Sequence, residues 1–98
     1  MQPQKKIDHA YKIITGINTL LEKKAMEIKG SSVYIFRELL GKDEKQHKAL
    51  MNNIYMYYRL KLKKEEGYSF YLMNIETKEM LGVFKNGQPN IESFLNNG

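Results

Sequence analysis

Cysteine and tryptophan are absent from this 98-residue sequence, and it has only two prolines and two histidines. The lack of cysteine excludes disulfide bonds, thiolate catalysis and cysteine-ligated zinc. No apolar run approaches the roughly 20 residues that a membrane-spanning helix needs. The basic first residues are not followed by the apolar block of a signal peptide. We therefore expect a cytoplasmic protein that does not enter a membrane.

The residue patterns of catalytic sites are also missing. The sequence contains neither G-x-x-x-x-G-K nor G-x-G-x-x-G, the glycine-rich patterns that hold phosphates. Asp43 and Glu44 suit the start of a helix better than a catalytic pair. Glu65 and Glu66 lie at an expected helix end, where contact with solvent is ordinary. His9 has no second ligand four residues later, as a metal-binding helix would. We expect no catalysis, no metal and no cofactor.

The sequence does contain an excess of lysine. Fourteen of its sixteen cationic residues are lysine, and the formal net charge is +5. Residues 1–30 carry six cations and three acids, residues 42–67 seven and four, and residues 68–98 two and three. Such a distribution favours a polyanionic partner, although net charge also serves solubility alone. The lysines and the eight asparagines also fit an AT-rich genome, which weakens the inference.

Residues 43–64 have the clearest pattern, and we predict one long helix there. At 100° per residue its apolar side consists of Leu50, Met51, Ile54, Tyr57, Tyr58 and Leu62. Its opposite side consists of Lys45, Lys48, Asn52, Arg59 and Lys63, with Met56 among them. Asp43 is placed to cap the first turn, and Gln46 to reach back as in a capping box. The helix therefore has a core face and a basic outer face.

Two further helices are predicted before this one. Residues 5–29 show apolar residues at steps of three and four, and Gly30 follows as a C-terminal cap. Residues 32–40 are expected to form a shorter helix that ends at Gly41. Its expected buried residues are Val33, Phe36, Leu39 and Leu40. Only Lys42 and Asp43 separate it from the third helix, which makes a tight helix–turn–helix.

The last third of the chain changes to a strand-like alternation. We predict a β-hairpin over about residues 68–86, with Tyr68, Phe70 and Leu72 facing inward. Asn86-Gly87 is a turn signal at its end. A short helix over about 90–96 then follows. Residues 1–98 thus form a single α+β domain of three helices, a hairpin and a short terminal helix.

This order of elements, with Gly41 at the turn, resembles a winged helix-turn-helix DNA-binding domain. The resemblance implies that the 43–64 helix enters the DNA major groove and that the hairpin is a wing beside it. Lysines would contact phosphates or guanine edges, and asparagine would read adenine. The DNA-binding residues that it implies are Lys42, Lys45, Lys48, Asn52, Asn53, Arg59, Lys63 and Lys78. A homodimer is also implied, through the first helix or the chain ends.

We therefore predict a sequence-preferring duplex DNA-binding protein that regulates or assists a plasmid, phage or other mobile element. The alternative is a small regulator or inhibitor that binds a protein partner through a Tyr/Met surface at Tyr55 and Met56. RNA is a third possibility, because the hairpin aromatics are able to stack on bases. The sequence does not identify the target or decide between DNA and RNA.

Overall fold

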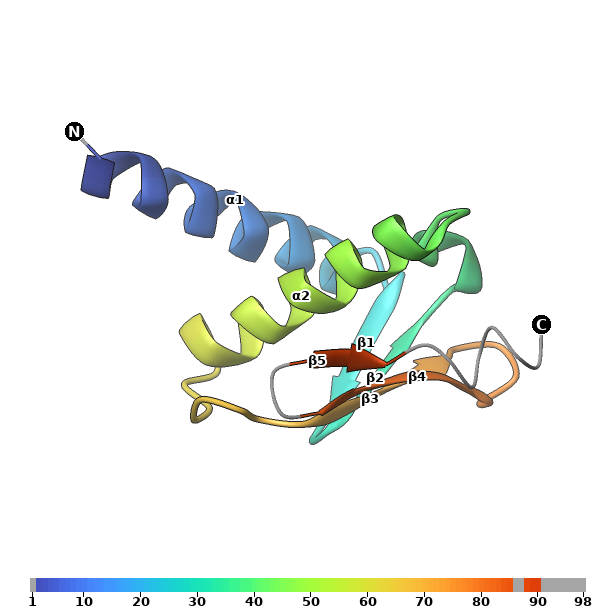
Figure 1. The fold of residues 1–98 in the computed structure, drawn as a ribbon. Helices are drawn as coiled ribbons and strands as arrows, with labels where there is room; N and C mark the ends of the chain where they lie inside the picture. The colour runs from blue at the N-terminus through green and yellow to red at the C-terminus, as the bar shows by residue number, and fades with distance from the viewer. Residues whose placement is uncertain (1, 86–87, 91–98) are drawn as a thin grey trace.

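The protein is a two-layer α+β domain with both helices on one face of a mixed sheet (Figure 1). The computed structural model describes the backbone of residues 2–85 and 88–90, and the side chains of residues 9–85, 88 and 89. In chain order the elements are α1 (Gln2–Glu22), β1 (Met26–Lys29), β2 (Ser32–Ile35), the 3₁₀ helix η1 (Arg37–Leu40), α2 (Glu44–Leu60), β3 (Phe70–Asn74), β4 (Met80–Lys85) and β5 (Gln88–Asn90).

The five strands lie side by side in sequence order, β1-β2-β3-β4-β5. Three of the four pairings are antiparallel, and only β2 and β3 run parallel. A parallel pair needs a crossover of a dozen or more residues, and η1 with α2 forms that connection. The crossover places α2 on one face of the sheet, where it packs beside α1.

The predicted winged-helix architecture of three helices and a C-terminal hairpin is wrong, and the first difference lies in residues 23–29. The helix ends at Glu22 because Lys24 adopts a left-handed backbone conformation (φ 60°). Residues Met26–Lys29 then alternate: Met26 is buried and Ile28 half-buried, while Glu27 and Lys29 are exposed. Apolar residues at positions 21, 25 and 28 fit a helical stripe, but the last of them belongs to a strand of period two.

The predicted helix over residues 32–40 is also wrong. Its first half is β2, in which Val33 and Ile35 are fully buried, and its second half is the single turn η1. Gly30, expected as a helix cap, instead starts the two-residue loop of the β1–β2 hairpin, with φ 61°. Phe36, expected in the core, is 36% exposed.

The third predicted helix exists, but it is shorter than 43–64. α2 ends at Leu60, and Lys63 adopts a left-handed conformation (φ 60°). The backbone N–H groups of Leu62 and Lys64 donate to the carbonyls of Tyr57 and Tyr58, which closes the last turn. Leu62, expected to be buried, is therefore 38% exposed beyond the helix end.

The predicted hairpin over residues 68–86 is confirmed as the antiparallel pair β3–β4. Phe70 and Leu72 face inward as expected, and Phe84 joins them opposite Phe70. Asn90 belongs to the short strand β5, whereas residues 91–96 of the predicted last helix lie outside the described residues, as does Asn86-Gly87.

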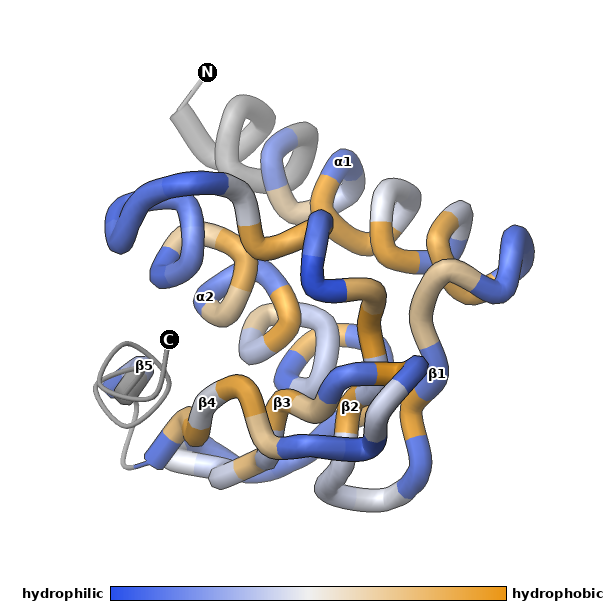
Figure 2. The backbone as a smooth tube through the Cα atoms, turned by 90° about the vertical axis from the view of Figure 1, so that its right-hand side faces the viewer, coloured by the Kyte–Doolittle hydropathy of each residue, from blue (hydrophilic) through white to orange (hydrophobic). Residues whose placement is uncertain are grey.

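The core fills the space between the helices and the sheet, where the hydrophobic segments of both layers meet (Figure 2). Five aromatic rings run through it in one continuous array: Tyr55, Phe84, Phe70, Tyr58 and Tyr68. Successive ring centroids lie 4.6, 5.1, 5.2 and 4.9 Å apart, the range in which aromatic pairs attract one another. This array ties α2 to the sheet.

Tyr58 illustrates how polar atoms in this core are satisfied. Its ring is fully buried, and its hydroxyl donates a 2.8 Å hydrogen bond to the carbonyl of Gly30 in the β1–β2 loop. Burial, with a smaller contribution from Tyr68, raises the pKa of the Tyr58 hydroxyl above its ordinary value. Burial likewise raises the pKa of Tyr57.

These tyrosines make the fold sensitive to alkali. A raised pKa in the folded state means that the folded protein holds its phenol proton where the unfolded chain loses it. The contribution of these two tyrosines to the free energy of unfolding should therefore be constant below pH about 10 and fall as the pH rises above that value. Thermal melting between pH 8 and 11 measures this decline. Tyr58→Phe should make stability fall less steeply with pH and leave the contribution of Tyr57. An unchanged dependence on pH would contradict the assignment of this effect to Tyr58.

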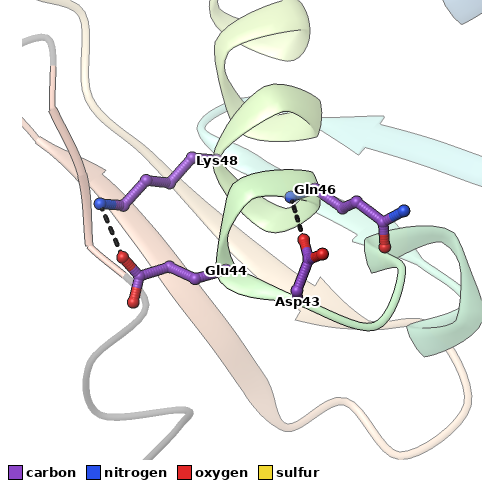
Figure 3. Close-up of polar contacts among 4 residues, drawn as sticks. All are labelled: Asp43, Glu44, Gln46 and Lys48. Atoms are coloured by element: carbon purple, nitrogen blue, oxygen red, sulfur yellow. Dashed lines mark hydrogen bonds and ion pairs between the residues drawn. The ribbon is translucent and has the colours of Figure 1, made fainter.

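The start of α2 is a capping arrangement close to the predicted one (Figure 3). The Asp43 carboxylate accepts a 2.9 Å hydrogen bond from the backbone N–H of Gln46. The Gln46 side chain reaches back as expected, but it accepts from the N–H of Lys42 at 2.6 Å rather than from that of Asp43. Gly41, at φ 83°, allows this return, because a Cβ there would collide with the Gln46 side chain.

Removing this cap should have a moderate effect. Asp43→Ala leaves the Gln46 N–H without its partner and is expected to lower the free energy of unfolding by about 1 kcal/mol. Urea unfolding followed by circular dichroism measures the change. Asp43→Asn, which keeps an acceptor oxygen, serves as the control and should be nearly neutral. A loss as large as that of Asp43→Ala in this control would show that the charge, not the cap, matters.

Candidate nucleic-acid interface

The outer side of α2 carries the residues predicted to contact DNA. The side chains that α2 packs inward are His47, Met51, Ile54, Tyr57 and Tyr58, all buried. On the opposite side, Lys45, Lys48 and Asn52 lie within about 60° of one another around the helix axis at 100° per residue. We call these three residues the basic strip. All three side chains are exposed.

The three side chains of the basic strip differ in their local partners. Lys48 forms an ion pair with Glu44 one turn earlier, at 3.0 Å (Figure 3). Both partners are about half exposed, so this pair contributes little to stability and leaves the lysine accessible. Lys45 and Asn52 have no hydrogen-bond or ion-pair partner among the described residues. Two cations and an amide are therefore available within two turns of helix.

The remaining predicted contacts are only partly gathered there. Lys42 precedes the helix and Asn53 lies beside the strip, and both are exposed. Arg59 lies near the far end of α2, where its guanidinium donates a 3.0 Å hydrogen bond to the carbonyl of Lys64. Lys63 lies in the loop beyond the helix.

Lys78, predicted at the tip of a wing, lies on the other side of the molecule. It belongs to the β3–β4 turn, and its ammonium lies 5.0 Å from the ring centroid of Tyr34. Tyr34 alternates along β2 with the buried Val33 and Ile35 and therefore faces away from the helices. The structure thus separates Lys78 from the basic strip by the thickness of the sheet.

The positive charge is concentrated in the helical layer. Residues 2–25 carry five cations and two acids, and residues 44–64 carry six cations and one acid. The strands and the β3–β4 turn, residues 26–35 and 70–85, carry three cations and three acids. A polyanion is therefore attracted to the helices more than to the sheet as a whole.

Of the Tyr/Met surface predicted around Tyr55 and Met56, Tyr55 is largely engaged in contacts within the domain. Tyr55 stacks on Phe84 at 4.6 Å and accepts a hydrogen bond from the Gly67 N–H at 2.8 Å. Met56 is half-buried. Exposed tyrosine and methionine occur instead on the sheet, where Tyr71 is 47% and Met80 50% exposed.

Comparison with known proteins adds no relative. No family model, curated protein or solved structure matches this chain. In the described part of the chain, no helix is long and apolar enough to cross a membrane. Within the same residues, no group of three or more His, Cys, Asp or Glu side chains is arranged to hold a metal ion.

Sequence reasoning missed the residues on the sheet surface that faces solvent. Tyr34 was assigned to a helix, so its place beside Tyr71 was not foreseen. The signal that identifies it is the dipeptide Gly30-Ser31 between two short alternating runs, a typical two-residue hairpin loop. Once that hairpin is recognised, alternation from Val33 places Tyr34 on the outer face.

Proposed function

We propose that this protein is cytoplasmic and that it binds duplex DNA through the basic strip of α2. The observation that carries the proposal is the exposed line of Lys45, Lys48 and Asn52 on a helix whose opposite side is fixed in the core. α2 is 17 residues, or about 25 Å, long. An α-helix fits the DNA major groove, so its first two turns have room to lie there.

The side chains of the strip match the two kinds of contact that duplex recognition requires. Lysine ammonium groups bind phosphates and guanine edges, which supplies affinity. The amide of Asn52, with that of Asn53 beside it, is suited to pair with the N6 and N7 atoms of adenine. Lys45 lies in the first turn of α2, where the positive end of the helix dipole also favours a phosphate. This arrangement supports a preference for sequence as well as for charge.

The proposal does not include winged-helix docking, because the β3–β4 hairpin expected as a wing belongs to the five-stranded sheet against which α2 packs. Lysines of α1 replace the wing as the neighbouring contacts: Lys12 is exposed on the helix that packs against α2. A homodimer remains a prediction, and the mass measured by light scattering in solution tests it. A dimer would present two basic strips to one duplex and favour a palindromic site.

Salt dependence of binding tests the function directly. Fluorescein-labelled duplex of 20 base pairs should bind with a log-affinity that falls with log salt at a slope of about −3 or steeper, since at least three lysines release counterions. Anisotropy at 50 and 200 mM NaCl measures it, with a single strand of equal length as the comparison. Absence of duplex binding at the lower salt concentration would overturn the proposal.

A further inference from the structure

The side of the sheet that faces away from the helices is a second surface with its own chemistry. Its residues are Glu27, Lys29, Ser32, Tyr34, Tyr71, Met73, Val83 and Lys85, which we call the open sheet face. Their neighbours along each strand are packed inward against the helices. Both helices lie on the opposite side of the sheet, and no described helix covers this face (Figure 1).

Two tyrosines occupy the middle of the open sheet face. Tyr34 on β2 is opposite Met73, and Tyr71 on β3 is opposite Ser32, so the two residues are diagonal neighbours on adjacent strands, two register positions apart. Tyr71 is 47% exposed, although a ring of that size gains from burial. Tyr34 is half-buried. Aromatic rings that reach the open face of a sheet are suited to stack on the splayed bases of a single strand.

Two cations lie beside the Tyr34 ring, and a third lies on the same face of the sheet. The ammonium groups of Lys29 and Lys78 lie 5.6 and 5.0 Å from the ring centroid of Tyr34. Lys85 is exposed on the same face of β4. The acid of this face, Glu27, is 3.7 Å from Lys29 and pairs with it. Lys29 and Lys85 of the open sheet face and Lys78 of the adjacent turn are matched in number by Glu27, Glu76 and Glu79, so these cations offer local contacts to phosphates rather than a net positive field.

We propose that the open sheet face binds single-stranded RNA, with two successive bases stacked on Tyr34 and Tyr71. A duplex keeps its bases stacked on each other, so only an unpaired strand uses exposed rings in this way. Ser32, directly opposite Tyr71, favours RNA over DNA, because its hydroxyl both donates and accepts and a ribose 2′-hydroxyl does the same. Lys29, Lys78 and Lys85 contact the phosphates.

This site is independent of the basic strip and differs from it in salt dependence. The sheet and its β3–β4 turn are balanced in charge overall, with Glu76 and Glu79 on either side of Lys78. Base stacking therefore contributes a larger fraction of the binding free energy on the open sheet face than on α2. RNA affinity should fall less steeply with salt than duplex affinity does.

Anisotropy with fluorescein-labelled oligouridine of 12 residues tests the proposal. Tyr71→Ala should weaken binding by about 5-fold or more, as should Tyr34→Ala, whereas Tyr71→Phe should retain it because the ring remains. Tyr11→Ala is the matched control, since Tyr11 is 68% exposed on α1. Equal affinity for oligothymidine, unchanged binding by Tyr71→Ala, or an equal loss in Tyr11→Ala would overturn the proposal.

Two further measurements separate this site from its alternatives. The double variant Lys45→Glu/Lys48→Glu should keep its RNA affinity, because both changes lie on α2 and not on the open sheet face. Failure of the duplex DNA proposal is therefore distinguishable from failure of the RNA proposal. A fluorescent polyglutamate peptide probes the rival occupant, an acidic protein segment. Tyr71-dependent binding of that peptide, without binding of oligouridine, would show a protein-binding face and overturn the RNA proposal.

Discussion

Replacing Phe84 with alanine is expected to lower the free energy of unfolding by about 3–5 kcal/mol, the range for large-to-small changes at buried aromatic positions. Phe84 is fully buried and lies between Tyr55 and Phe70 in the aromatic array, at 4.6 and 5.1 Å. Its removal leaves a cavity at the point where α2 meets β4. A domain of this size is stabilised by only about 5–15 kcal/mol, so the variant should be near the limit of folding.

Urea unfolding monitored by circular dichroism measures this loss, and the neighbouring strand provides the control. Tyr71→Ala removes an aromatic ring of similar size from β3, on the face opposite to that of Phe84. Because Tyr71 is 47% exposed, its loss should change the stability by about 0.5 kcal/mol or less. Similar losses of stability in both variants would contradict the assignment of Phe84 to the buried face of the sheet and of Tyr71 to the open face.

Reversing two charges on the basic strip should have the largest effect on DNA binding. At 0.1 M salt each phosphate contact accounts for about a tenfold change in affinity, given a log–log slope of about −0.9 per contact. Lys45→Glu/Lys48→Glu removes two contacts and adds two repulsive charges, so duplex affinity should fall at least about 100-fold. The fold should persist, since both side chains are exposed and the Glu44–Lys48 pair contributes little.

The matched control carries the same change of net charge on the other layer. Lys29→Glu/Lys78→Glu reverses two exposed cations beside Tyr34, beyond the sheet from α2. Duplex affinity should change only slightly, because at 0.1 M salt electrostatic interactions over more than about 10 Å are largely screened. If both double variants lose affinity equally, net charge rather than the basic strip drives binding. A folded α2 variant with unaltered affinity would exclude this helix as the contact surface.

The sequence predicted α2 well because several independent signals agree there. The cap Asp43, the inward set Met51, Ile54 and Tyr58, and the exposed Lys45 all follow from one helical period. The β3–β4 hairpin was also predictable, since alternation from Phe70 has no helical competitor. The site residues on the first turns of α2 followed directly from that helix.

Residues 26–40 show why the rest was not predictable by the same reasoning. Four-residue strands are too short to separate a period of two from one of 3.6, and Val33, Ile35 and Leu40 fit either pattern. Tertiary pairing decides the outcome, because β2 gains partners on both sides, β1 and β3. Because residues 26–40 are predicted as helical, the sequence does not predict the open sheet face. Its two tyrosines, Tyr34 and Tyr71, belong to strands far apart in the sequence.

The single parallel pairing in this sheet has a consequence for its cooperativity. Within the described sheet, two locally closed units, β1–β2 and β3–β4–β5, are joined by the pairing of β2 with β3, whose strands are separated in sequence by residues 36–69. The amides at this junction, such as those of Tyr71 and Ile75 bonded to the carbonyls of Ser31 and Ile35, should exchange with deuterium sooner than those inside either unit. A strand of RNA stacked on Tyr34 and Tyr71 would span the junction, and would slow that exchange by holding the two halves of the sheet together.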